Sequence, residues 1–223
     1  HAGAYVRRAR MRGRMAYLVY FNLENFSVFN ERYGFEEGDR LLLLMSVAIQ
    51  AAFPGYLLSR FSEDHFLLVC ESINLEESIL DVREQLHAYG RNANVELKAG
   101  IFCLEDDKLD IGTACDRAKI ACDSIAHRYD RTFRWYDDEL DWQVERSQYI
   151  ESHIDRAVEN GWIKVFYHPI LDTGTGKVSV FEGLARWIDP VKGMLSPADF
   201  IPILEDEKLI YKVDLHIVDV ILE

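Results

Sequence analysis

The sequence lacks several features that would each indicate a class of protein. No apolar run approaches the ~18 residues of a membrane-spanning helix, and we identify no signal peptide. The four cysteines form no Cys-x-x-Cys pair and lie beside no histidine cluster, so reduced structural thiols are expected rather than zinc ligands. Positive charge is also scarce: the 223 residues carry a net charge of −13, the opposite of a nucleic-acid-binding surface. We therefore expect neither a nucleic-acid partner nor a membrane segment in this chain.

The first twenty residues differ from the rest, because they contain five arginines and no acidic residue. Such a run could bind nucleic acid or anionic lipid. We favour instead the solvated face of a helix over residues 5–14, which would pack through Val6, Ala9 and either Met11 or Met15.

The apolar pattern predicts an α/β sandwich, because β-prone runs alternate with segments of helical spacing. Strands and a hairpin are expected at the apolar runs, and helices in the segments between them. The expected strands are 16–22, 95–104 and 133–137, the hairpin is 55–70, and the helices are about 38–52, 75–91 and 110–125.

The hairpin tip, residues 60–66, reads Arg-Phe-Ser-Glu-Asp-His-Phe. Upstream lie Asn22-Leu23-Glu24-Asn25-Phe26 and, after Asn30, the run from Tyr33 to Asp39. This order and spacing resemble the GGDEF family, which condenses two GTP molecules into cyclic di-GMP. The resemblance implies a nucleotidyl-cyclase-like sandwich whose nucleotide-binding positions fall here on Asn22, Asn30, Asp39, Ser62, Glu63, Asp64 and His65.

Several of these positions depart from the family pattern. The tip of the family reads Arg-x-Gly-Gly-Asp/Glu-Glu-Phe, whereas Ser62 and Glu63 replace both glycines here and His65 replaces the second acid. Glycines let backbone amides approach a triphosphate, and Glu63 adds a negative charge there. The family's first metal-binding Asp is replaced by the neutral Asn22. We therefore expect no cyclase activity.

Metal and nucleotide binding are still possible interpretations of the remaining residues. Asp64 matches the second metal-ligand position, and Glu24 lies on the same strand face as Asn22, where it could replace the missing ligand. Asn30 and Asp39 match the family's guanine-reading residues. The alternative is that Asn30 ends a helical turn and Asp39 caps the following helix. The family's product-inhibition motif falls on residues 53–56, Phe-Pro-Gly-Tyr, and is absent.

A single long helix is predicted from 138 to 160, with an apolar stripe and a stop at Asn160-Gly161. It would link two domains and could pair with its twin in a homodimer. Packing on its own domain is an equally good interpretation.

Beyond this helix, residues 182–187 read Glu-Gly-Leu-Ala-Arg-Trp and residues 196–202 read Ser-Pro-Ala-Asp-Phe-Ile-Pro. This segment resembles the opening of the EAL domain, a TIM-type barrel that cleaves cyclic di-GMP. The resemblance implies that Glu182 is a metal ligand, Arg186 a phosphate contact and Leu184 part of the substrate pocket. His168 stands where the family has a ligand-contacting Gln.

We accordingly expect a degenerate GGDEF domain at 1–137, a linker helix at 138–160 and the first part of an EAL domain at 161–223. A barrel of this kind takes ~250 residues, so we expect a fragment of a longer protein that is itself too short for phosphodiesterase activity. The unfinished barrel would favour self-association, strand exchange or packing onto the first domain. We expect Mg²⁺ or Mn²⁺ in the intact protein and GTP as a regulatory ligand.

The sequence patterns are consistent with three functions, of which the first two are compatible with each other. The GGDEF domain could be a non-catalytic regulator that binds GTP or a partner, the intact protein could be a cyclic-di-GMP phosphodiesterase, or the chain could be a dimerisation scaffold that binds no nucleotide. We expect a cytoplasmic location, with any membrane attachment supplied by an upstream segment.

Overall fold

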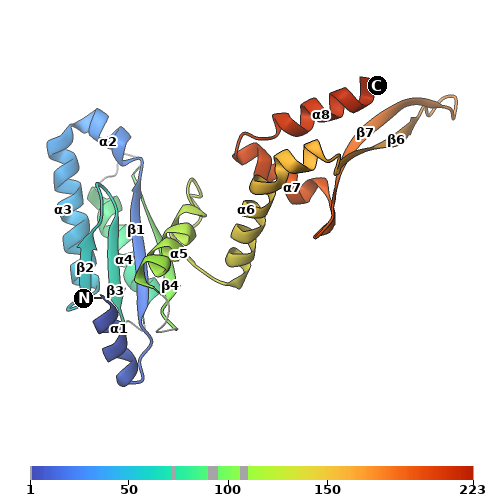
Figure 1. Ribbon diagram of the computed structural model, residues 1–223. Coiled ribbons are helices and arrows are strands. Elements are labelled where there is room, and N and C mark those ends of the chain that lie inside the picture. The colour runs from blue at the N-terminus through green and yellow to red at the C-terminus, as the bar shows by residue number, and fades with distance from the viewer. Residues whose placement is uncertain (1, 72–73, 90–94, 106–109, 223) are drawn as a thin grey trace. The chain divides into compact units, whose positions relative to one another are not determined.

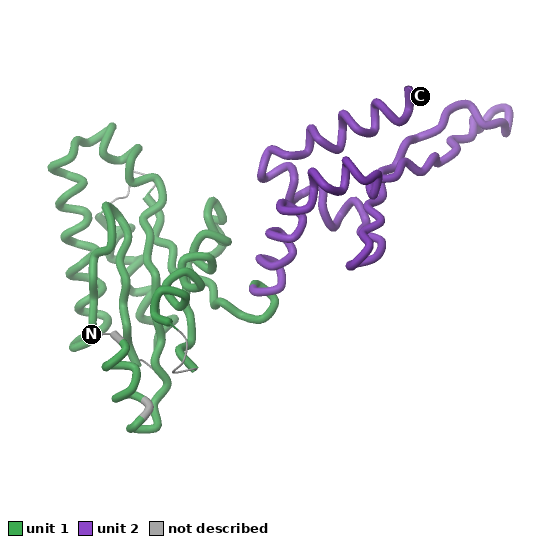
Figure 2. Tube along the Cα trace, viewed as in Figure 1, with its two compact units in different colours: residues 1–140 green, residues 141–223 purple. Residues whose placement is uncertain are grey.

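The computed structural model describes residues 2–71, 74–89, 95–105 and 110–222. The chain forms two compact units, residues 1–140 and 141–223 (Figure 2). Each unit has its own hydrophobic core.

The first unit is built on a five-stranded sheet with strand order β2-β3-β1-β4-β5 (Figure 1). Its central strand β1 pairs antiparallel with both β3 and β4, and β5 runs parallel to β4 at one edge. The strands are β1 Tyr17–Glu24, β2 Leu57–Arg60, β3 Phe66–Cys70, β4 Glu96–Cys103 and β5 Phe133–Trp135. The predicted hairpin is confirmed as the antiparallel β2–β3 pair.

Helices cover both faces of this sheet, as expected because its central strand β1 is apolar on both sides. Val19, Phe21 and Leu23 of β1 lie in one core with α2, α3 and α4, while Leu18 and Tyr20 lie in a second core with α1 and α5. The helices are α1 Ala2–Met11, α2 Phe26–Tyr33, α3 Phe35–Ala52, α4 Leu75–Tyr89 and α5 Ile111–Asp123. The α/β sandwich expected from the sequence is confirmed.

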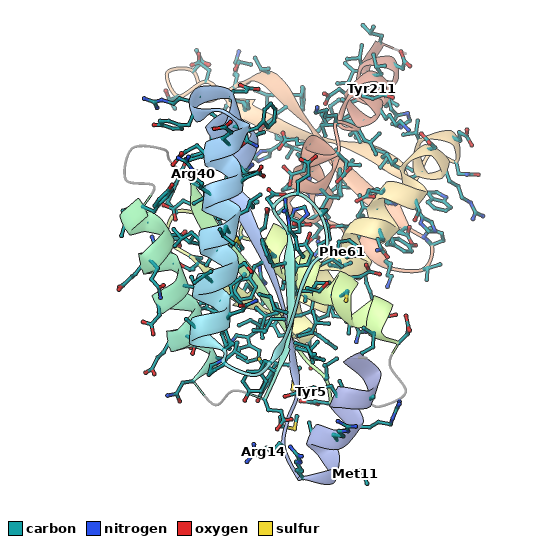
Figure 3. All side chains as sticks on the ribbon, turned by 90° about the vertical axis from the view of Figure 1, so that its left-hand side faces the viewer. Tyr5, Met11, Arg14, Arg40, Phe61 and Tyr211 are labelled. Carbon is teal, nitrogen blue, oxygen red and sulfur yellow. The ribbon has the colours of Figure 1, made fainter. Side chains whose placement is uncertain are left out.

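The N-terminal helix differs in detail from the prediction. Val6 and Ala9 are buried, but Met11 is 88% exposed at the end of α1 (Figure 3). Met15 is also exposed. The expectation that one of these methionines packs inside was wrong, because α1 ends at Met11 and Met15 lies in the connection that follows the helix.

The helix predicted from about Gly38 begins three residues earlier, at Phe35. Gly34 precedes it with a φ of 86°, a backbone conformation that glycine adopts at little cost. Asp39 therefore lies inside α3, and the interpretation of Asp39 as a helix cap was wrong.

The second unit contains a three-stranded antiparallel sheet, β6-β7-β8, with three helices. Within its described residues the sheet does not close into a barrel. The elements are α6 Asp138–Glu159, β6 Ile163–Leu171, β7 Val178–Asp189, β8 Gly193–Leu195, α7 Pro197–Asp206 and α8 Tyr211–Leu222.

The long helix α6 has the extent that its sequence predicts, but much of it belongs to the second unit. Ile150 and Ile154 of α6 are buried in one core with Trp187 of β7 and Phe200 of α7. Of the two interpretations of this helix, packing on its own domain is therefore the better one for its C-terminal half.

Candidate functional site

A cavity of about 740 Å³, here called the β1 cavity, opens where β1 ends in the first unit. Its wall comes from the end of β1, from α2, from the β2–β3 hairpin tip and from the residues after α5. The lining residues are 22–27, 30, 31, 34, 35, 63–65, 126 and 127. The fold thus brings together Asn22, Asn30, Glu63, Asp64 and His65, five of the residues that the sequence singled out.

Two local backbone features place Asn30 in this wall. Asn25 takes a left-handed conformation, with a φ of 62°, and turns the chain from β1 directly into α2. Gly34 then ends α2 by donating its N–H to the carbonyl of Asn30 at 2.8 Å. The side chain of Asn30 packs against Gly38, where a Cβ would lie 1.8 Å from Asn30 Oδ1.

The hairpin tip is tied together by its own side chains. Arg60 donates through Nε and Nη2 to the carbonyl of Glu63, at 3.0 and 2.6 Å. Ser62 Oγ lies 2.6 Å from His65 Nδ1, and the His65 ring lies against that of Tyr20 with centroids 5.3 Å apart. Phe61 projects from the tip and is 72% exposed (Figure 3). The arginine and the serine are thus engaged within the tip.

The charge of the β1 cavity is unfavourable for a polyanion. Four carboxylates line it, those of Glu24, Glu31, Glu63 and Asp64, whereas the described lining contains no lysine and no arginine. His65 Nε2 lies 3.5 Å from Asp64 Oδ1 and would offset one charge only when protonated. A triphosphate in this cavity would face net negative charge.

The cavity also contains unsatisfied acceptors. The amide oxygens Oδ1 of Asn22 and Asn30 are buried and have no hydrogen-bond partner among the described residues. Buried polar atoms are normally paired, so each of these oxygens marks a place where a donor from a ligand or water would be stabilising.

Asp39 and Ser62 are not part of this wall. Asp39 lines a separate cavity of about 380 Å³ with Leu43, Arg60 and Phe66. The structure therefore does not bring the two expected guanine-reading residues, Asn30 and Asp39, into one cavity.

Glu24, the expected replacement for the missing metal ligand, already has partners. It is 8% exposed, accepts the backbone N–H of His127 at 2.6 Å and lies 3.8 Å from Lys98 Nζ. Lys98 is itself only 2% exposed and donates to the carbonyls of Arg128 and Arg131. Sequence reasoning missed this pair, although a lysine inside an apolar strand was the available signal.

The donors at this place fit a divalent cation poorly. Mg²⁺ requires oxygen ligands with one or more free carboxylates, but Asn22 is neutral and Glu24 is occupied by Lys98 and His127. Among the described residues, no group of three or more His, Cys, Asp or Glu side chains is arranged to hold a metal ion.

In the second unit, β7 carries its signature residues on one face. Glu182, Leu184 and Arg186 alternate along the strand and therefore point the same way. In the β6–β7 register His168 is opposite Glu182, so both belong to this face. Trp187 and Ala185 occupy the other face and are buried. The four predicted residues are thus brought to one surface of the hairpin.

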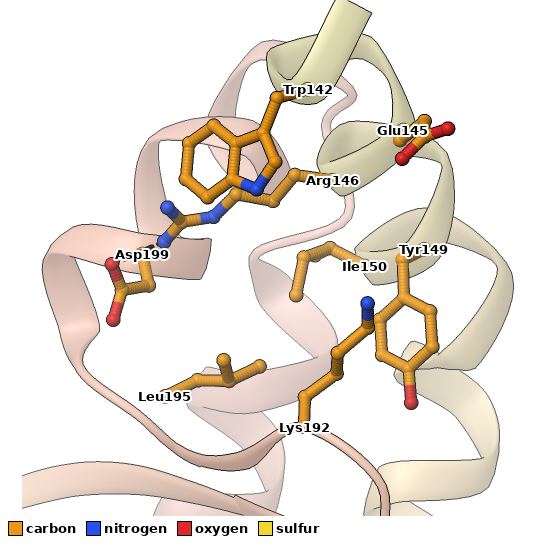
Figure 4. Close-up of a pocket in the computed structure, with 8 residues that line it drawn as sticks. All are labelled: Trp142, Glu145, Arg146, Tyr149, Ile150, Lys192, Leu195 and Asp199. Carbon is orange, nitrogen blue, oxygen red and sulfur yellow. Dashed lines mark ion pairs between the residues drawn. The ribbon is translucent and has the colours of Figure 1, made fainter.

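A second cavity, of about 460 Å³, lies within the second unit between α6, the β7–β8 turn and the start of α7 (Figure 4). It is lined by aromatic and charged side chains, including Trp142, Tyr149 and Lys192. Arg146 forms an ion pair with Asp199, which also completes a capping box with Ser196. No sequence motif had indicated this cavity.

Comparisons with known proteins agree with this architecture. The family model for the GGDEF domain of diguanylate cyclases matches residues 3–132, and that for the EAL domain matches residues 151–223. The cyclic di-GMP phosphodiesterase PdeB of Shewanella oneidensis is 29% identical over 90% of this chain and 25% of its own length. The cyclic di-GMP phosphodiesterase PdeR of Escherichia coli is 27% identical over 86% of this chain and 30% of its own length.

Among solved structures, the S helix–GGDEF–EAL portion of Vibrio cholerae LapD, bound to c-di-GMP, covers 98% of this chain and 53% of its own length. The TM-score is 0.54 at 12% identity, a likeness of fold. The chain belongs to the GGDEF family, and an EAL-domain match follows the GGDEF match along the chain. The chain spans about a fifth to a third of the length of the curated relatives it matches.

No described helix has the length and apolar character that would let it span a membrane.

Replacement of Lys98 by Met is expected to lower the free energy of unfolding by about 3–5 kcal/mol, because it leaves Glu24 as an unpaired buried carboxylate. Urea denaturation would measure the loss. The control is Lys119→Met, which removes an exposed lysine paired with Asp123 on α5 and should cost less than about 1 kcal/mol. Equal losses in the two variants would contradict a buried Lys98–Glu24 pair.

The Arg146–Asp199 ion pair should make part of the free energy of unfolding sensitive to acid. Hydrogen bonds from Arg146 and then from Ser196 lower the pKa of Asp199 below its usual value. A lowered pKa stabilises the fold above the unfolded pKa of about 3.9, and this contribution is lost as the pH falls through the folded pKa. Asp199→Asn should therefore lower the free energy of unfolding at neutral pH. Below a pH of about 4, this free energy should fall less steeply in the variant than in the original chain.

Urea unfolding followed by tryptophan fluorescence at neutral and acidic pH would test this. The exposed Asp206, on the same helix, provides the control variant Asp206→Asn, which should keep the acid dependence of the original chain. An unchanged acid dependence in Asp199→Asn would show that the ion pair does not contribute.

Proposed function

We propose that the first unit is a non-catalytic GGDEF domain that regulates a cyclic-di-GMP phosphodiesterase, to which the EAL segment contributes. The single observation that carries this is the state of the β1 cavity. Its metal position is neutral at Asn22, its remaining carboxylate Glu24 is paired, and its hairpin tip presents Glu63 where glycine backbone would meet a triphosphate.

In this proposal, the first unit regulates the phosphodiesterase through contacts with other parts of the protein. A cavity lined by four carboxylates and, among its described residues, no lysine or arginine repels a triphosphate. Because the fold is retained while the catalytic groups are replaced, the domain can still transmit a change in conformation to its neighbour. We also propose the domain limits 1–137, 138–160 and 161–223. A homodimer would form through the N-terminal half of the helix at 138–160 or through the open sheet of the second unit, because the C-terminal half of the helix packs in its own unit.

The phosphodiesterase part rests on β7. Glu182 would hold Mg²⁺ or Mn²⁺, Arg186 would bind a phosphate of cyclic di-GMP, and Leu184 and His168 would complete the surface on which the substrate lies. The metal, when bound, supplies a Lewis acid for phosphodiester hydrolysis. Arg186 offers a guanidinium fork suited to a phosphate, at the position nearest the buried end of the strand.

A second candidate is a guanine-nucleotide sensor, favoured by the unpaired amide oxygens of Asn22 and Asn30. Guanine presents N–H donors that such oxygens could accept. In this function GTP is bound and not turned over.

Glu182→Gln in the full-length protein is expected to lower kcat for cyclic-di-GMP hydrolysis by at least about 100-fold, because the metal loses an anionic ligand. The matched control is Glu205→Gln, an exposed glutamate on α7 that should leave kcat unchanged. An unchanged kcat in Glu182→Gln would show that Glu182 is not a metal ligand.

Calorimetric titration of this chain with GTP, with and without Mg²⁺, separates the two candidates for the first unit. We expect no saturable heat and no cyclic di-GMP formed, because of the acidic lining. Saturable binding that is lost in Asn30→Ala and kept in Asp39→Ala would instead establish the sensor, since only Asn30 lines the β1 cavity. Cyclic di-GMP synthesis would overturn the proposal altogether.

A further inference from the structure

The register of the first sheet places a buried lysine beside two residues of the β1 cavity wall, although the lysine does not itself line the cavity. In the antiparallel β1–β4 pair, Lys98 is directly opposite Asn22, and Glu24 is the next residue of β1 on the same face. Residues opposite one another in such a pair share a face of the sheet. The three side chains therefore stand together where the family has its metal position.

The ammonium of Lys98 has partners on several sides. It donates to the carbonyl of Arg128 at 2.6 Å and to that of Arg131 at 2.8 Å. Two of its three donors are thus hydrogen-bonded, and Glu24 Oε2, at 3.8 Å, is its ion-pair partner. The contacts tie the segment between α5 and β5 to the central strands.

Glu24 is engaged from its other oxygen as well. Oε1 accepts the N–H of His127, whose backbone has a φ of 60° in the left-handed region. Both carboxylate oxygens therefore have a partner inside the protein. For a metal ion to use Glu24, it would have to displace the ammonium or lie beside it, which like charges disfavour.

The other donors near this place do not restore a metal site. Asn22 contributes at most a neutral amide oxygen, and Asp64 has His65 Nε2 at 3.5 Å. Glu31 and Glu63 also line the cavity, but among the described residues no three His, Cys, Asp or Glu side chains are grouped to hold one ion, so a hard dication would be bound weakly.

We propose that the buried ammonium of Lys98 is a built-in cation that replaces the divalent metal of the catalytic relatives, so that the β1 cavity binds no divalent cation. This deepens the proposed loss of catalysis and rests on it. The charge of Glu24 is thus offset within the protein by Lys98, and the neutral Asn22 adds no anionic ligand.

The test is titration with Mn²⁺ alone, followed by electron paramagnetic resonance of the free ion, in a Glu182→Gln background that removes the second unit's candidate ligand. The chain should bind Mn²⁺ at most weakly, and so should Asn22→Asp, because Lys98 still pairs with Glu24. Asn22→Asp combined with Lys98→Met should bind at least about tenfold more tightly than Asn22→Asp alone. Asn22→Asp combined with Lys119→Met, the matched control, should behave as Asn22→Asp.

Folding is followed in the same variants by thermal unfolding. If Lys98→Met destabilises the chain, Mn²⁺ should raise the melting temperature of the double variant and not that of the Lys119→Met control, since a ligand stabilises only the state that binds it. Saturable Mn²⁺ binding by the chain that is lost in Asp64→Asn, or equal binding by Asn22→Asp and the double variant, overturns the inference.

These outcomes are independent of the test of function. A chain that binds Mn²⁺ but forms no cyclic di-GMP would refute the built-in cation and leave the non-catalytic role intact. Cyclic di-GMP synthesis would refute the non-catalytic role itself.

Discussion

The central strand β1 is buried on both faces, and the rest of the first unit depends on this constraint. Its alternate residues enter two separate cores, one with α2, α3 and α4 and the other with α1 and α5. A shift of register by one residue would exchange these faces. The same alternation that fills the cores places Asn22 and Glu24 on a common face at the end of the strand, where the β1 cavity opens.

The charge of Glu24, at the end of β1, is balanced within the protein. A lysine and a glutamate that are nearly inaccessible to solvent must be paired, because an isolated buried charge is very costly. Lys98 pairs with Glu24, and it also donates hydrogen bonds to carbonyls of the segment that follows α5. In the proposed non-catalytic domain, this internal cation takes the place of the bound metal.

Much of the architecture could be predicted from local pattern. The hairpin, the helix that begins at Leu75 and the long helix from Asp138 lie where apolar spacing indicated, and the predicted last residues of the second, 90 and 91, lie outside the described residues. The errors occurred where local signals were weak or ambiguous. Gly34, in a left-handed conformation, rather than Asp39, sets the start of α3, and the two methionines near α1 face solvent although an amphipathic pattern allowed them inside.

The sequence by itself determined the families, the order of the elements and the replaced motif residues, because these depend on residue identity and short spacing. Only the tertiary structure decided which of these residues share a cavity. Asn22, Asn30, Asp64 and His65 meet in one, while Asp39 lines another and Lys98 joins Glu24 from a strand more than seventy residues away. Such pairings depend on strand register and on burial, which no local pattern encodes, since the partners become neighbours only when the sheet forms.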